Sequence, residues 1–225
     1  MGTNIRYKRP DGGEATGYLA SAAESGAPGL VVLQEWWGLQ DQIKGVCDRL
    51  ARAGFTALAP DLFRGAVVPY HDSDAAGRAM ASLDFAEATE QMVGGAVNYL
   101  AANGAKVGLI GFCMGGAITV IGACRLKPLS AAVAFYGLPP EEVAPPSAIQ
   151  VPFQAHFASR DDWCTPAVVD RFEAGLRAAG NKAEIFRYEA DHAFLNEQRM
   201  TVHDRAAADL AWGRALTFLR ETLRP

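Results

Sequence analysis

The stretch 106–120, KVGLIGFCMGGAITV, contains the features that decide the fold. Its first part, 107–110, is a short apolar run bounded by glycines, which predicts a buried strand. From Ala117 onward the sequence predicts a helix. Between the two lies the pattern G-x-C-x-G-G, with Cys113 at its centre. Glycines at this spacing indicate a sharp turn, because residues without a Cβ let the strand and the helix approach closely.

A cysteine in such a turn is suited to nucleophilic chemistry. The turn places Cys113 at a helix N-terminus, where the helix dipole favours a thiolate. This is the pattern of the nucleophile elbow of α/β-hydrolases, with cysteine where serine usually stands. A free cysteine can also be a small buried apolar residue, and dinucleotide-binding turns also contain glycines. The order G-x-G-x-x-G is absent here, so we favour the elbow.

Composition limits the class of protein. The 225 residues, half of them apolar, suffice for one domain with a large core, so we expect a single domain over 1–225. A net charge of −4 without a basic stripe disfavours nucleic acid as a partner. No signal-peptide core follows Met1, and no run approaches the roughly 18 apolar residues of a membrane span. We therefore expect a cytoplasmic protein that does not bind membranes.

The four cysteines give no sign of a metal site. They lack C-x-x-C spacing, which indicates neither zinc binding nor a disulfide framework. We expect no metal and no organic cofactor.

Strand and helix signals alternate along the rest of the chain. Residues 3–20 predict a β-hairpin with its turn at 10–13. Further strands are expected at 30–33, 55–59, 131–136, 151–157 and 183–188. Helices are expected at 40–53, 74–83, 84–101, 166–180 and 206–223. This alternation predicts an α/β fold with a mostly parallel central sheet and helices on both faces.

Reactive side chains follow four of the predicted strands. They are Glu35, Cys113, the pair Asp161 and Asp162, and His192. Ligands bind outside the carboxyl ends of the strands in such sheets, so these side chains should converge. The order nucleophile, acid, histidine is that of α/β-hydrolases, which makes His192 the expected base. Either aspartate could be the acid that fixes the imidazole tautomer.

The other three histidines have simpler interpretations. His156 lies in an apolar strand and is expected to be a core residue with satisfied hydrogen bonds. His71 lies in a surface excursion, and His203 lies close to the start of the last helix. None of them is a candidate for the base.

Taken together, the motifs resemble the dienelactone hydrolase (carboxymethylenebutenolidase) family of the α/β-hydrolase superfamily. They span almost the whole chain in the family's order: Q-E followed by two bulky residues and Gly38, G-F-C-M-G-G, H-F-x-x-x-D-D with a later proline, and D-H-A-F. The resemblance implies an α/β-hydrolase fold with Cys113 as nucleophile and His192 as base. It implies Asp162 as the acid, because the acid stands six residues after the histidine of H-F and four before the proline.

The resemblance also implies roles for residues around the nucleophile. Glu35 resembles the family's extra carboxylate, which holds the resting thiol neutral and accepts its proton when substrate enters. Its alternative is a surface loop residue. The oxyanion hole would consist of the backbone N–H groups of Met114 and Trp36.

The expected substrate is a small ester or lactone. Aromatic residues that could form an apolar wall for it, or belong to the core, are Trp36, Trp37, Phe63, Tyr136 and Trp163. Family members that act on dienelactones bind the ring carboxylate with arginines, one of them soon after the histidine motif. Asn196 stands at that position here, so Arg199 and Arg78 are the candidates to replace these arginines.

The sequence therefore predicts an ester or lactone hydrolase that acts through a Cys-His-Asp triad and a thioester acyl-enzyme. We expect a monomer or a weak homodimer. Two other functions remain as alternatives. One is a thiol redox protein that uses Cys113 with Cys164 as its resolving cysteine. The other is a catalytically inactive hydrolase-fold interaction protein.

Overall fold

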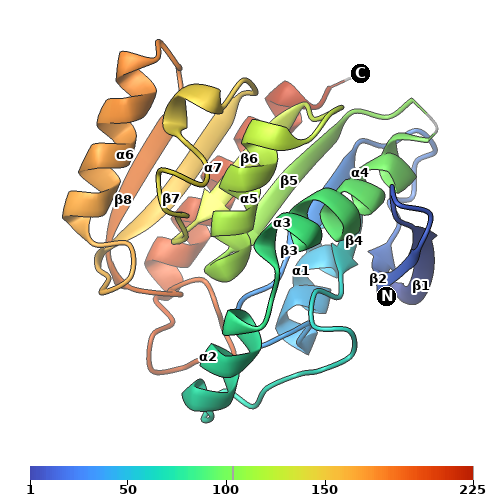
Figure 1. Cartoon of the computed structure of the whole chain (residues 1–225), viewed down its shortest axis with the longest axis horizontal. Helices are drawn as coiled ribbons and strands as arrows, with labels where there is room; N and C mark the ends of the chain where they lie inside the picture. Colours follow the sequence, from blue (N-terminus) through green and yellow to red (C-terminus); the bar gives the residue numbers. More distant parts are fainter. Residues whose placement is uncertain (103, 225) are drawn as a thin grey trace.

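The computed structural model describes residues 1–102 and 104–224, and an eight-stranded sheet runs through them (Figure 1). The strand order is β1-β2-β4-β3-β5-β6-β7-β8. The hairpin pairs β1 with β2, and β2 continues antiparallel to β4, whereas all other neighbours are parallel. The strands are β1 (Thr3–Lys8), β2 (Glu14–Ala20), β3 (Gly29–Leu33), β4 (Thr56–Pro60), β5 (Val107–Phe112), β6 (Ala131–Phe135), β7 (Phe153–Arg160) and β8 (Glu184–Asp191).

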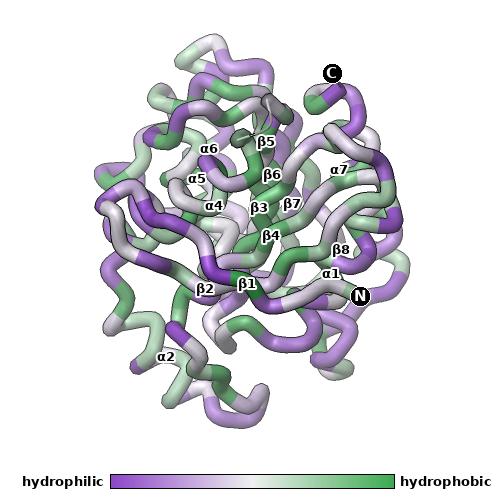
Figure 2. The backbone as a smooth tube through the Cα atoms, turned by 90° about the vertical axis from the view of Figure 1, so that its right-hand side faces the viewer, coloured by the Kyte–Doolittle hydropathy of each residue, from purple (hydrophilic) through white to green (hydrophobic). Residues whose placement is uncertain are grey.

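The central strands are apolar along their whole length. Every residue of β3, β5 and β6 is buried, as expected for parallel strands covered on both faces. Figure 2 shows these strands as a hydrophobic band inside a more hydrophilic shell. The edge strands β1 and β8 carry exposed residues among buried ones. The hydrophobic runs in the sequence therefore mark the middle of the sheet.

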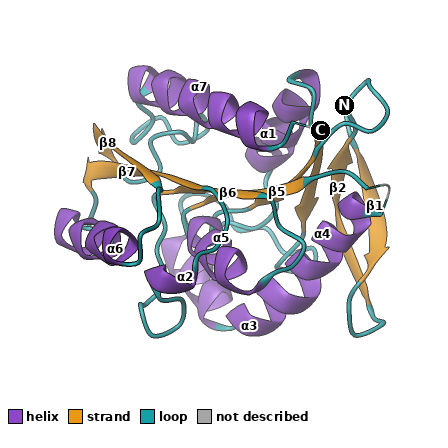
Figure 3. Ribbon diagram, turned by 90° about the horizontal axis from the view of Figure 1, so that it is seen from above, coloured by secondary structure: helices purple, strands orange, loops and turns teal. Residues whose placement is uncertain are grey.

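Helices cover both faces of the sheet (Figure 3). One face carries α1 (Asp41–Arg52) and α7 (Arg205–Thr222). The other face carries α2 (Ser73–Ala81), α3 (Phe85–Glu87), the π-helix η1 (Ala88–Val93), α4 (Gly94–Ala101), α5 (Met114–Arg125) and α6 (Pro166–Ala178). A short 3₁₀ helix, η2 (Pro146–Ala148), precedes β7. The predicted α/β fold with a mostly parallel sheet is confirmed.

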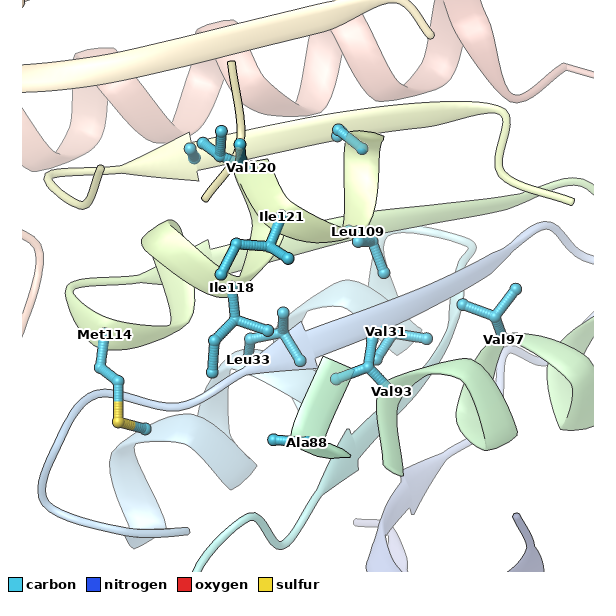
Figure 4. Packing of buried hydrophobic residues seen from close by; sticks show 14 of the residues in the cluster. Val31, Leu33, Ala88, Val93, Val97, Leu109, Met114, Ile118, Val120 and Ile121 are labelled. Atoms are coloured by element: carbon cyan, nitrogen blue, oxygen red, sulfur yellow. The ribbon is translucent and has the colours of Figure 1, made fainter. Parts of the chain in front are cut away.

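The core consists of two large apolar clusters, one on each face of the sheet. The cluster beneath α5 includes Leu33, Met114, Ile118 and Ile121 (Figure 4). The opposite cluster packs α1 and α7 against the other side of the same strands. α5 begins directly after Cys113 and packs on β3 and β5. The position of this helix therefore fixes the direction in which Cys113 projects.

Two element boundaries differ from the prediction in ways that affect the site. β7 continues to Arg160 instead of ending at Phe157, with a register irregularity between Ala158 and Arg160. α5 begins at Met114, immediately after Cys113. Both elements therefore end or begin directly beside a candidate reactive residue.

Within the described residues, none of the helices has the length and apolar character needed to cross a membrane.

Candidate active site

The turn between β5 and α5 holds Cys113 in an unusual backbone conformation. Its φ of 54° and ψ of −118° lie outside the regions that residues with a Cβ normally occupy. The glycines allow this turn: a Cβ on Gly111 would overlap the carbonyl group of Gly115, and a Cβ on Gly115 would overlap that of Leu33. The tight turn predicted from the glycine spacing is confirmed.

Most strain of this kind in the described chain lies around one cavity. Four non-glycine residues of the described chain have positive φ. Three of them, Cys113, Tyr136 and Ala193, line the same cavity, whereas the fourth, Arg64, does not. Such conformations cost of order 1–3 kcal/mol each and persist where the surrounding structure enforces them, often at functional sites. The clustering thus points to this cavity as the functional site.

His192 and Asp161 form a buried pair at the ends of neighbouring strands. The ring donates through Nδ1 to Asp161 Oδ2 over 2.8 Å. The side chain of Asp161 is fully buried and that of His192 is 18% exposed. Burial alone would lower the pKa of His192, but the bond to Asp161 and the neighbouring Cys113 sulfur outweigh it and raise that pKa. The imidazolium is therefore stabilised here.

The prediction that Asp162 is the acid beside His192 is wrong by one residue. Because β7 extends to Arg160, Asp161 is the first residue beyond the strand, and its side chain turns towards β8. Its other oxygen, Oδ1, accepts the backbone N–H groups of Trp163 and Cys164 over 2.8 and 3.0 Å. Asp162 lies within this small turn and is exposed.

Glu35 is a buried residue, which contradicts its alternative interpretation as a surface loop residue. It lies two residues beyond β3 and is 2% exposed. Its Oε1 accepts from the Tyr136 hydroxyl over 3.3 Å, and its Oε2 accepts from Asn196 Nδ2 over 2.8 Å. Burial raises the pKa of Glu35, and the hydrogen bond from Asn196 opposes this only in part.

Asn196 is a site residue that sequence reasoning did not assign. It is fully buried, and its amide holds the Glu35 carboxylate. The signal was its position four residues after His192, where the resemblance called for an arginine. A neutral amide at this position supplies a hydrogen bond without a positive charge. It therefore stabilises ionised Glu35 less than an arginine would.

Two backbone N–H groups near Cys113 are free to bind an oxyanion. Met114 is the first residue of α5, and the first N–H groups of a helix have no partner within it. In the described chain, no acceptor is found for the N–H of Met114 or of Trp36. Both residues line the cavity that contains Cys113. They are thus compatible with the expected oxyanion hole.

One cavity of about 1040 Å³ brings most of the predicted residues together. Its lining includes Glu35, Cys113, Asp161 and His192. It also includes the predicted contact residues Trp36, Trp37, Tyr136, Trp163 and Arg199. The convergence of the strand ends is therefore confirmed.

Phe63 and Arg78 were expected at the substrate and do not lie there. Neither is among the described residues that line the cavity. Phe63 packs against the core cluster beneath α5, and Arg78 is exposed on α2. Arg199 does reach the cavity, with its guanidinium 5.3 Å from the centre of the Trp37 ring. Phe63 thus contributes to packing, because an aromatic residue of the core and one of a cavity wall look the same in the sequence.

Cys164 lies at the cavity but is poorly suited to redox exchange. It is buried, and burial together with the Asp161 charge raises its pKa to about 12. The thiolate is the reactive form in disulfide exchange. This disfavours Cys164 as a resolving cysteine.

The remaining histidines lie apart from the site. His156 is buried, with Nδ1 2.8 Å from the Tyr188 hydroxyl and Nε2 2.9 Å from Gln154 Oε1. The prediction of a core histidine with satisfied hydrogen bonds is confirmed. His71 is exposed, and His203 lies just before α7 with Nδ1 3.0 Å from the Phe194 carbonyl oxygen. Within the described chain, no three His, Cys, Asp or Glu side chains form a group that could hold a metal ion.

Comparison with known proteins identifies the family. The model of the dienelactone hydrolase family matches residues 15–223. Protein usf of Aquifex pyrophilus is 32% identical over 99% of this chain and 100% of its own length. A protein of Aquifex aeolicus, provisionally named a carboxymethylenebutenolidase, is 30% identical over 100% of both chains.

A solved structure supports the same conclusion. A dienelactone hydrolase-like promiscuous phosphotriesterase from metagenomic libraries has a TM-score of 0.84 and 26% identity, covering 99% of each chain. The sequence and the fold thus agree: this chain belongs to the dienelactone hydrolase family and is a dienelactone-hydrolase-like hydrolase.

Proposed function

We propose that this protein hydrolyses a small carboxylic ester or lactone through a thioester formed on Cys113. The observation that carries the proposal is the buried His192–Asp161 pair, which lines the same cavity as a cysteine held on a strained strand-to-helix turn. A nucleophile, a base and a residue that orients the base are the parts that covalent acyl transfer needs. We assign the orienting role to Asp161.

The first half of the reaction transfers the acyl group to sulfur. Glu35 accepts the thiol proton of Cys113 when substrate enters, a task for which its raised pKa suits it. The thiolate attacks the carbonyl carbon, and the N–H groups of Met114 and Trp36 stabilise the oxyanion. The C–O bond then breaks, and the leaving alkoxide takes a proton from the His192 imidazolium.

The second half regenerates the enzyme. Neutral His192 removes a proton from water, the resulting hydroxide attacks the thioester, and the C–S bond breaks. The acid leaves, His192 is again protonated, and Glu35 returns its proton to the thiolate. Each cycle consumes one water and releases one acid and one alcohol. Asp161 keeps the imidazole in the required tautomer throughout.

A thiol redox function is the weaker candidate. It requires a second reactive thiol, and burial raises the pKa of Cys164, the cysteine that shares the cavity. Of the two arginines expected to bind a substrate carboxylate, Arg199 lines the cavity and Arg78 does not. We therefore do not restrict the proposed substrates to dienelactones. We propose an ester or lactone as the substrate class, a cytoplasmic location, and a monomer or weak homodimer.

The acyl-enzyme gives a direct test. Incubation with a slowly hydrolysed aryl ester, followed by peptide mass analysis, should place the acyl group on Cys113. Cys113→Ala should abolish ester turnover, whereas Cys124→Ala should leave it unchanged, because Cys124 lies at the far end of α5 from the elbow. Acylation at Cys164, or turnover that survives Cys113→Ala, would refute the mechanism.

A further inference from the structure

The cavity around Cys113 has two chemically different ends. Its charged lining residues lie at or after the carboxyl ends of β3, β7 and β8, the strands that position His192 and Asp161: Glu35, Arg160, Asp161, Asp162, Asp191 and Arg199. The other end is lined by apolar side chains from α2, α3, α5 and the loop after β6: Met80, Phe85, Ala117, Ile121, Leu138 and Val143. We call this set the apolar arm.

The apolar arm belongs to the face of the sheet that carries α5. Met80, Phe85 and Leu138 pack against the core cluster that contains Ile121. The helices α2, α3 and α5 all lie on this face (Figure 3). Ile121 is buried, whereas Met80, Phe85, Ala117 and Leu138 are only partly buried and Val143 remains 37% exposed. An apolar wall that stays open to a cavity is the usual lining of a small-molecule site.

The reaction geometry assigns one half of the ester to this arm. His192 must deliver a proton to the leaving oxygen, so the alcohol portion lies on the side of His192. The acyl portion, bonded to Cys113, must then extend away from His192. We place it along the first turn of α5, which follows directly after Cys113 and where Ala117 lines the cavity with a side chain of one carbon.

We infer that the apolar arm is an acyl-chain subsite and that the preferred substrates are esters of unbranched apolar acids of medium length. The inference rests on the proposed function. Ile121 lies eight residues after Cys113, about 12 Å along the helix axis, which matches an extended acyl chain of roughly eight carbons. The cation in the last turn of α5, Arg125, bonds to Glu90 and to the Val143 carbonyl. Its charge is therefore already paired, and a carboxylate on the acid gains no partner there.

A chain-length series tests this subsite. The specificity constant kcat/KM for aryl esters should rise from acetate to octanoate, by up to about fourfold for each methylene that is buried. It should then level off or fall for longer chains. A monoester of a dicarboxylic acid should be hydrolysed more slowly than the apolar ester of equal length. Equal values across the series would overturn the inference.

Two variants localise the effect. Ala117→Leu fills the arm near Cys113, and Val143→Asp places a charge at its exposed end, where the fold tolerates substitution. Each should lower the octanoate-to-acetate ratio of kcat/KM by at least about tenfold. The matched control is Ala86→Leu, because Ala86 is exposed beside Phe85 and does not line the cavity. Unchanged ratios in both arm variants would overturn the subsite.

A pair of isomers separates the acyl and alcohol ends. Ethyl octanoate should be a better substrate than octyl acetate, and the reverse preference would place the chain on the alcohol side and refute the inference. The proposed function fails in a different way, since acetate ester turnover would then survive Cys113→Ala. If Cys113→Ala is inactive and the ratios are flat, hydrolysis stands and the acyl subsite falls.

Discussion

At the scale of single residues, adjacent side chains of the same type have different environments. Asp161 and Asp162 are the same chemical group, one peptide bond apart, yet one is bonded to His192 and the other is exposed. The end of β7 decides this difference, because it determines which side chain points to β8. Burial adds to it by excluding water from the bond between Asp161 and His192.

Substitution of the two aspartates should give clearly different losses. Asp161→Asn leaves the imidazole without the acceptor that fixes its tautomer, a change that costs about 10⁴ in a serine protease. A thiol needs less help in losing its proton, so we expect kcat to fall by at least about tenfold. Steady-state kinetics on an aryl ester measure this loss. Asp162→Asn is the control, and a larger loss there than at Asp161 would contradict the pairing.

Asn196 should tune the proton affinity of Glu35. The hydrogen bond from its amide stabilises the ionised carboxylate, so Asn196→Leu should raise the pKa of Glu35 further. If Glu35 exchanges a proton with Cys113, the pH profile of Cys113 alkylation by iodoacetamide should differ from that of the wild type. Glu35→Gln should remove this dependence on position 196. Identical profiles for wild type and Asn196→Leu would show that Asn196 serves packing alone.

At the scale of elements, the elbow is a contact between β5, α5 and the end of β3. Gly115 opens the first turn of α5 and lies against the backbone of Leu33 and Gln34. The same close approach places the end of β3, and therefore Glu35, beside Cys113. One glycine thus connects the backbone geometry at Cys113 with that at Glu35.

Two glycine substitutions separate the effect of the close contact at Gly115 from the effect of helix propensity. Gly115→Ala adds a methyl group where backbone atoms already lie, so we expect a loss of about 1–3 kcal/mol in the free energy of unfolding. Gly45→Ala, in the interior of α1, meets open space and should gain about 0.5–1 kcal/mol. Urea unfolding of both variants measures the difference. A neutral Gly115→Ala would contradict the close approach.

At the scale of the whole molecule, the sheet brings distant parts of the chain to one edge. Glu35 and Asn196 are 161 residues apart in sequence and are joined by a hydrogen bond. The parallel arrangement accounts for this, because β3, β5, β7 and β8 all end at the same side. These residues therefore come together only when the sheet is folded.

Acid should destabilise the sheet through His156. Burial lowers its pKa to about 3, from about 6.5 in the unfolded chain. Between these values the unfolded chain binds a proton that the folded protein does not, so stability is lost as pH falls through this window. The loss from pH 7 to pH 5 amounts to about 2 kcal/mol.

Urea unfolding at both pH values measures that loss. His156→Gln should reduce the difference between the two pH values by about 2 kcal/mol, although its stability at pH 7 is lower. His71→Gln is the matched control, since His71 is exposed and its removal should leave the difference unchanged. An equal pH dependence in wild type and His156→Gln would show that His156 is not buried in its neutral form.

The sequence by itself determined the α/β class, the tight turn around Cys113 and the convergence of Cys113 and His192 on one cavity. These features depend on local patterns: apolar runs, glycines at a turn, and motif order along the chain. The tertiary structure alone decided that Asp161 is the aspartate bonded to His192, that Asn196 bonds to Glu35, and that Phe63 and Arg78 lie outside the cavity. Each of these depends on where a strand ends or which face a side chain joins. A shift of one residue at a strand end reverses the direction of a side chain, and hydrophobic pattern fixes such ends only loosely.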